Sequence, residues 1–242
     1  MALLGRVLQV LIRHIFPLGM YPLVDVHTHQ KHGCAIELVA IQTPSHAEGF
    51  CSLGIHPWHV GEINEEQAEA ELKMMETAEV AAIGEIGADK IRGGDIERQL
   101  KLFEKEVAIA QRRRLPVIIH SVKAFEPIIE ILARYPLRAV VFHSWIGSEQ
   151  QAAQAINRGY MFSFGPRSLA SSRGVETLKK IDERFLLLES DDSGVEIAEI
   201  YRQVARLREE SEEHLRKVVF KNFTEIWQNG WSAPSCCSAP RK

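Results

Sequence analysis

The sequence predicts a single α/β barrel in which eight parallel strands alternate with helices. From Tyr21 onward, short aliphatic or β-branched runs alternate with longer, charged amphipathic stretches, which is the pattern of repeated strand-then-helix units. Eight runs have the composition of strands, and eight is the strand number of a (β/α)8 barrel. The length of 242 residues also suits one such barrel, because barrels of this kind run to about 250 residues.

The eight predicted strands are residues 22–26, 36–41, 50–55, 80–83, 117–119, 139–142, 160–164 and 185–188. The clearest helix follows Asp95, a good N-cap, and has one apolar stripe among charged positions. Another begins after Asn64, which has Gln67 three residues later as in a capping box. Further helices are predicted at residues 124–134 and 148–157 and in the charged region 195–227.

The connection between the second and third predicted strands is short. Only residues 42–49 join them, whereas a parallel crossover usually needs a dozen residues or more. We therefore expect an irregular barrel around the first three strands, with segment 36–41 either antiparallel to its neighbour or outside the barrel. The predicted organisation is an N-terminal extension over residues 1–19, one barrel domain over 20–230 and a disordered tail over 231–242.

Composition excludes several classes of protein. A net charge of −3 excludes a protein that holds nucleic acid mainly through a strongly basic surface. The four cysteines form no C-x-x-C pair, which favours a reducing cytoplasm over a disulfide framework. The apolar segment 3–16 contains two arginines and is too short and polar for a membrane span, so it is either an upstream extension or a surface-docked helix. No P-loop, G-x-G-x-x-G or G-x-S-x-G motif is present, so we expect no nucleotide cofactor.

Metal-ligand side chains stand where the predicted strands end. The C-terminal ends of barrel strands meet at one face, so such residues come together although they lie far apart in the sequence. His27 and His29 follow the first strand and point the same way on an extended chain. The ligand-type residues after later strands are His56, Glu85, His120, His143 and Asp191. This nitrogen and oxygen set suits zinc, manganese or magnesium, which predicts a metal site at the C-terminal face.

Several short motifs surround these residues in a fixed order. They are Asp-x-His-x-His at 25–29, Gly-Ile-His-Pro at 54–57, Gly-Glu-Ile-Gly-x-Asp at 84–89, Pro-Val-Ile-Ile-His-Ser at 116–121, His143 with Gly147, Ser-Phe-Gly at 163–165 and Glu-Ser-Asp at 189–191. Their order and spacing resemble the TatD-type metal-dependent hydrolases, which belong to the amidohydrolase-like barrels. The resemblance extends over residues 23–227.

The resemblance implies a site with two divalent metal ions, drawn from magnesium, manganese and zinc. One ion would be held by His27, His29 and Asp191, and the second by His120 and His143. Glu85 would bridge the two ions, and Asp191 would also receive the proton of the attacking water. His56 would face the substrate phosphate, although its place beside Pro57 also fits a bracing role in the loop.

The resemblance further implies a deoxyribonuclease that removes nucleotides from DNA 3′ ends, with DNA bound transiently. Two alternatives stay open: a two-metal hydrolase of a small ester, amide, lactone or D-aminoacyl-tRNA, and a metal-binding interaction protein without catalysis. Trp58 and Trp145 follow strand ends and would either stack on a base or pack at the rim. Arg167 and Arg173 are candidates for phosphate contact, and Ser163 and Glu189 for orienting the ligands.

Departures from the family pattern surround the site without replacing a ligand, among them Val122-Lys123 after His120-Ser121 in place of Arg-Asp. The chain between His29 and Gly54 is shorter than in relatives and lacks their first helix. Lys90 stands where relatives often have an aromatic residue, and residues 192–194 read Asp-Ser-Gly in place of a proline-rich loop. These differences are expected to affect substrate preference more than metal binding.

Overall fold

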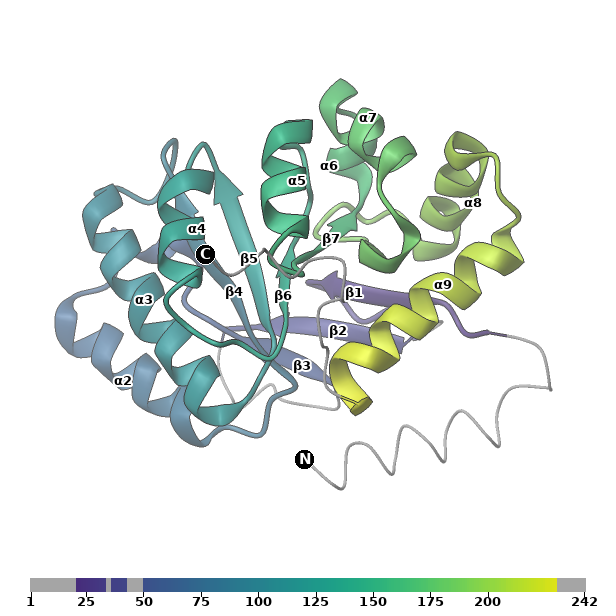
Figure 1. The fold of residues 1–242 in the computed structure, drawn as a ribbon. Coiled ribbons are helices and arrows are strands. Elements are labelled where there is room, and N and C mark those ends of the chain that lie inside the picture. The colour runs from purple at the N-terminus through teal and green to yellow at the C-terminus, as the bar shows by residue number, and fades with distance from the viewer. Residues whose placement is uncertain (1–20, 34–35, 43–49, 230–242) are drawn as a thin grey trace.

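A computed structural model of the 242-residue chain describes residues 21–33, 36–42 and 50–229 (Figure 1). The predicted extension over 1–19 and tail over 231–242 lie outside these residues. Within the described part, no helix is long and apolar enough to cross a bilayer.

The described strands form one parallel sheet in sequential order. They are β1 Val24–Thr28, β2 Ile36–Ile41, β3 Cys51–Leu53, β4 Ala82–Asp89, β5 Val117–Val122, β6 Val140–Phe142, β7 Met161–Phe164 and β8 Leu186–Leu188. The first and last strands meet just beyond β8, where Thr28 and Asp191 form a parallel bridge. The Asp191 N–H donates to the His27 carbonyl at 3.0 Å, and the His29 N–H donates to the Asp191 carbonyl at 3.3 Å. The result is the predicted (β/α)8-like barrel, nearly closed, with helices around it (Figure 1).

The helices follow the strands and cover the outside of the sheet (Figure 1). They are α2 Glu65–Thr77, α3 Ile96–Arg113, α4 Phe125–Leu132, α5 Glu149–Ile156, α6 Pro166–Leu169, α7 Ser172–Lys180, α8 Ile197–Arg208 and α9 Glu212–Thr224, with short turns η2 Pro57–His59, η3 Glu183–Phe185 and η4 Glu225–Asn229. Both predicted N-caps are confirmed. Asn64 and Gln67 form a reciprocal capping box at α2, and the Asp95 side chain accepts from the Glu97 N–H at α3.

The expectation for segment 36–41 was wrong. Strand β2 is a barrel strand and pairs parallel with both β1 and β3. Ile41 pairs with Leu53, which lies three residues after Phe50. The connection from Ile41 to Phe50 therefore has to run back by only three residues of strand, or about 10 Å. The eight residues between Ile41 and Phe50 can reach about 27 Å, so a parallel return of this length needs no helix. The irregularity expected near the first strands is present as a register shift between β1 and β2.

Strand β4 is longer than predicted because it continues through two glycines. Gly87 has φ +144°, and a Cβ there would lie 2.0 Å from the His120 carbonyl oxygen. The glycine therefore lets β4 run close beside β5. All eight residues of β4 are buried, including Glu85 and Asp89. These two carboxylates consequently belong to a rigid strand rather than to a loop after it.

A buried carboxyl group of α3 supports the loop that precedes the site. Glu106 is 1% exposed, and its Oε1 accepts a 2.7 Å hydrogen bond from the Ile55 N–H. Burial raises the pKa of Glu106 well above its ordinary value of 4.5, although the Ile55 N–H opposes this shift. The raised pKa stabilises the fold fully below pH 4.5, and this stabilisation is lost as the pH rises toward the folded-state pKa.

We therefore expect Glu106→Gln to become more stabilising relative to the wild type as the pH rises. Glutamine keeps an oxygen acceptor for Ile55 but carries no charge to bury. Urea unfolding at pH 5 and pH 8 measures the difference in free energy of unfolding. The exposed Glu130 on α4 provides the control, because Glu130→Gln should show no comparable trend. An advantage of Glu106→Gln that stays constant with pH would contradict a protonated Glu106.

Candidate metal centre

One carboxylate lies at the centre of the site. Glu85, which is 6% exposed, has the ring nitrogens of five histidines around its two oxygens. The distances are 3.2 Å to His27 Nε2, 3.7 Å to His29 Nε2, 3.1 Å to His56 Nε2, 2.5 Å to His120 Nδ1 and 2.7 Å to His143 Nε2. The strands that carry these residues deliver them to the same end of the barrel, as predicted.

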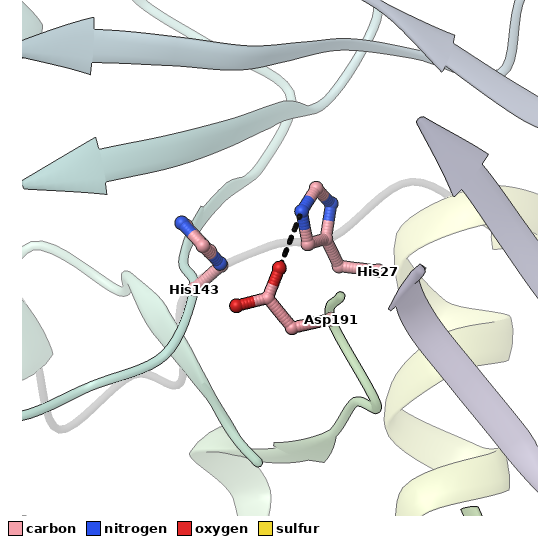
Figure 2. A group of neighbouring side chains, drawn as sticks. All are labelled: His27, His143 and Asp191. Carbon is pink, nitrogen blue, oxygen red and sulfur yellow. Dashed lines mark ion pairs between the residues drawn. The ribbon is translucent and has the colours of Figure 1, made fainter. Parts of the chain in front are cut away.

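Asp191 stands beside this cluster, just after β8. Its Oδ1 lies 3.5 Å from His29 Nε2 and 3.7 Å from His27 Nε2, and Figure 2 shows the latter pair together with His143. Its Oδ2 accepts a 3.3 Å hydrogen bond from the Ser144 hydroxyl. The backbone of Asp191 has φ +55°, in the left-handed region where aspartate and asparagine are among the commoner non-glycine residues. The bridge to Thr28 holds this conformation at the closure of the barrel.

The donor set fits a divalent cation. Among the residues that the structure describes, three groups of three ligand atoms lie within 4.8 Å of one another: His27 with His143 and Asp191, His27 with His29 and Glu85, and His56 with Glu85 and His120. Neither nitrogen of the buried His27 ring has a hydrogen bond of normal geometry, although Nε2 lies 3.2 Å from a Glu85 oxygen. Buried polar atoms without partners are costly, so a cation that accepts their lone pairs would relieve that cost.

The pKa shifts show an environment that attracts positive charge. Burial alone would raise the pKa of Glu85, but His143, His120 and His27 outweigh burial and hold that pKa well below its ordinary value. Burial alone would lower the pKa of His143, but Glu85 and Glu189 raise it well above its ordinary value. Hydrogen bonds to Asp191 and Glu85 raise the pKa of His29 to about 9. Without a metal ion, the imidazoles supply the charge that the carboxylates require by taking up protons.

Two of the candidate ligand imidazoles have a carboxylate behind the ring. His120 Nε2 lies 3.2 Å from Asp89 Oδ2, and His143 Nδ1 lies 3.5 Å from Glu189 Oε1. A carboxylate behind a ring holds a proton on the rear nitrogen and leaves the front nitrogen for a metal. His120 and His143 both direct the other nitrogen at Glu85. Their arrangement therefore supports the ligand role that the sequence suggested.

His56 has the opposite arrangement. Its Nδ1 accepts the Trp58 backbone N–H at 3.1 Å, so the neutral ring carries its proton on Nε2, which faces Glu85 Oε1 at 3.1 Å. Burial lowers the pKa of His56, which favours this neutral form. A nitrogen that holds a proton cannot ligate a metal. His56 is therefore a hydrogen-bond donor to Glu85 here, close to the bracing role considered from the sequence.

Glu189 anchors the end of β6 and is fully buried. It accepts hydrogen bonds from the Ser144 N–H at 2.7 Å, the Ser144 hydroxyl at 2.6 Å and the Ser163 hydroxyl. The sequence suggested orienting roles for Ser163 and Glu189, and these contacts support them. The structure adds Ser144, which also reaches Asp191.

Asp89 was missed by the sequence analysis as a supporting residue. It accepts the Trp58 indole N–H at 2.6 Å on the oxygen that also faces His120. Asp89 lies four residues beyond Glu85 on the same strand, so the two side chains share a face. Side chains alternate between the two faces of a strand, so a predicted strand reaching residue 89 would have placed Asp89 on the same face as Glu85.

The cluster opens into a cavity of about 270 Å³. Its lining residues are His29, Ala40, Ile41, Gln42, Gly54, His56, Trp58, His59, Glu85, His120, His143, Arg167, Asp191 and Asp192. The predicted substrate contacts His56, Trp58 and Arg167 are among them, and so is Asp192, one of the departures from the family pattern. Arg173 is absent from this lining.

Trp145 lies elsewhere. It is 4% exposed and packs in the core against Phe125, Phe142 and Phe162, with ring centroids 5.8, 5.7 and 4.6 Å away. The turn after β6 directs its indole inward between strand and helix, so no face of the ring is open to a base. Trp145 is therefore a core residue and not a candidate substrate contact.

A family model described as TatD related DNase matches residues 19–228, which is most of the chain. The chain belongs to the TatD related DNase family. Crystal structures confirm the fold of this family. The TatD homologue YjjV of Escherichia coli has a TM-score of 0.72 at 24% identity, covering 86% of this chain and 98% of YjjV. A TatD family hydrolase of Entamoeba histolytica has a TM-score of 0.71 at 17% identity, covering 86% of this chain and 99% of that protein.

Curated TatD relatives match a shorter segment. The Escherichia coli protein, named uncharacterized metal-dependent hydrolase YjjV, is 34% identical over 153 residues, which is 59% of this chain and 57% of YjjV. The human deoxyribonuclease TATDN3 is 29% identical over 57% of this chain and 56% of its own length. The 3′-5′ ssDNA/RNA exonuclease TatD of Erwinia tasmaniensis is 30% identical over 59% of this chain and 57% of its own length. Each match therefore spans less than two thirds of the relative.

Proposed function

We propose that this chain is a divalent-metal-dependent hydrolase of phosphodiester bonds that removes nucleotides from the 3′ end of DNA. The observation that carries the proposal is the buried Glu85 carboxylate, which is surrounded by five imidazoles and opens into a cavity beside Asp191. Family membership and the names of the human and Erwinia relatives support this reaction class.

Two divalent ions would be held by the histidines and carboxylates around Glu85. His27, His29 and Asp191 would hold one ion, and His120 and His143 the other, with Glu85 shared between them. The carboxylates behind His120 and His143 and the nitrogens of His27, which lack hydrogen bonds, support these ligand roles. The mixed nitrogen and oxygen set accommodates zinc, manganese or magnesium.

When bound, divalent ions would supply positive charge to the attacked phosphodiester and acidify the attacking water. Asp191 would accept the proton of that water at Oδ2, because Oδ1 faces His27 and His29. His56 would keep Glu85 in place through its Nε2–H. Arg167 and Trp58, which line the same cavity, would contact the substrate. The low pKa of Asp191, set by His29, His143 and His27 against the effect of burial, keeps its carboxylate ionised.

A time course with a 5′-labelled single-stranded oligonucleotide tests the proposal. With Mg²⁺ or Mn²⁺, we expect a ladder that shortens from the 3′ end. A chelator should abolish the ladder, and an excess of the same ion should restore it, because the site residues would depend on the ion for reaction. A circular single strand, which has no 3′ end, is the matched control substrate and should stay intact.

If folded, metal-loaded protein leaves the oligonucleotide intact over hours, the nuclease proposal is wrong. A panel of small esters, amides, lactones and D-aminoacyl-tRNA then tests the alternative hydrolase substrates. Absence of any metal-dependent turnover in that panel would favour the non-catalytic alternative.

A further inference from the structure

Two guanidinium groups face the ring of Trp58; Trp58 and Arg167 line the cavity, whereas Arg92 lies outside its lining. The Cζ atom of Arg92 lies 4.5 Å from the centroid of the Trp58 ring, and that of Arg167 lies 5.9 Å from it. The three residues come from separate parts of the barrel: Trp58 from η2 after β3, Arg92 from the connection between β4 and α3, and Arg167 from α6 after β7. The fold therefore assembles a group that no sequence motif contains.

The indole is held in one orientation. Its N–H donates to Asp89 Oδ2 at 2.6 Å, and Asp89 is 2% exposed. The other oxygen of Asp89 accepts the backbone N–H groups of Ile91 and Arg92 at 2.7 and 3.1 Å. The same carboxylate thus orients the ring and ties down the loop that carries Arg92. Trp58 is consequently a fixed platform for the guanidinium group above it.

The two arginines are left without an acidic partner. Among the described residues, neither Arg92 nor Arg167 forms an ion pair with a carboxylate, whereas Arg98, Arg112 and Arg184 do. Both side chains are exposed, and Arg167 lines the cavity that contains Glu85. A guanidinium group that stacks on an aromatic ring keeps its N–H donors available. Such donors match the two oxygens of a phosphodiester.

We propose that Trp58, Arg92 and Arg167 form a clamp for a second phosphate, next to the phosphodiester that is cleaved at Glu85. This inference rests on the proposed phosphodiesterase function and defines its substrate class more closely. The preferred substrate is a chain with at least two neighbouring phosphodiesters, because an isolated diester leaves the clamp empty. The clamp also assigns Trp58 a role different from base stacking, since Arg92 already covers its ring at 4.5 Å.

Kinetics on two substrates test the clamp. A deoxythymidine trinucleotide offers a second phosphate, whereas the 4-nitrophenyl ester of thymidine 5′-phosphate offers only the scissile diester. We expect Arg92→Ala and Arg167→Ala each to raise KM for the trinucleotide about tenfold more than KM for the ester, with kcat affected little. Arg206→Ala is the matched control, because Arg206 is an exposed arginine in the last turn of α8 that neither lines the cavity nor faces the Trp58 ring. An equal change on both substrates would overturn the clamp.

Binding without turnover gives a second readout. Fluorescence anisotropy of a labelled oligodeoxythymidine, measured in a chelator, gives the association constant as a function of salt. The association constant falls as salt rises, and each lost phosphate contact should make this negative slope of log K against log salt shallower by about 0.7 for a single strand. An unchanged slope in the double variant would contradict the clamp. If the wild type cleaves no DNA, the proposed function fails and the binding measurement decides the clamp by itself.

Discussion

Asp191→Asn should lower the kcat of metal-dependent turnover by at least about 10³-fold while the protein stays folded. The side chain combines two tasks in the proposed mechanism, since Oδ1 faces His27 and His29 and Oδ2 is the proton acceptor. An amide nitrogen at either position cannot replace a carboxylate oxygen as a ligand or base. The loss should appear in kcat with a smaller change in KM.

Asparagine is the appropriate substitution for this position. It tolerates the left-handed backbone at φ +55°, and the main-chain hydrogen bonds to His27 and His29 are unaffected. The far-ultraviolet circular dichroism and the urea midpoint should therefore stay close to those of the wild type. Asp95→Asn removes the same charge at the N-cap of α3, where asparagine caps equally well, and should leave turnover unchanged. Turnover of Asp191→Asn within tenfold of the wild type would refute the assigned role.

Glu85→Gln should remove metal binding, with an expected loss of affinity of at least about 100-fold. Replacing groups that merely orient a ligand costs 10- to 100-fold, and Glu85 lies inside the ligand set itself. Isothermal titration with Mn²⁺ or Zn²⁺ gives the affinity, and metal analysis after dialysis gives the stoichiometry. Two ions per wild-type chain would support the shared role of Glu85. Wild-type stability should also rise with added ion, and that of Glu85→Gln should not.

The same variant has a predicted pH dependence without metal. Glu85 helps to raise the pKa of His143 well above 6.5 and that of His29 to about 9. A raised histidine pKa stabilises the fold fully below pH 6.5, and the effect fades as the pH rises through the folded-state values. Glu85→Gln should therefore cost more stability at pH 6 than at pH 9. Glu130→Gln is the matched control, because the exposed Glu130 on α4 lies outside the cavity lining and should change neither metal affinity nor the pH dependence of stability. A uniform loss across this pH range would contradict the charge coupling.

Several features of the site were predictable from local sequence. The ligand-type residues stand at strand ends, and a parallel barrel brings all its strand ends to one face, so His27, Glu85 and Asp191 were expected to meet. Helix starts were equally predictable, because an N-cap such as Asn64 forms its hydrogen bond with a residue only three positions later. These signals act over short distances or follow from a topology that eight alternating units already imply.

The sequence by itself therefore determined the barrel class and the set of residues that gather around Glu85. Only the tertiary structure decided the parallel course of β2, the burial of Trp145 and the meeting of Arg92 and Arg167 over Trp58. It also decided that His56 accepts a backbone N–H where His120 and His143 face a carboxylate. The physical reason is the range of the contacts. Periodicity and capping depend on near neighbours, whereas the partner behind each imidazole or guanidinium depends on the register and spacing of strands far apart in the chain.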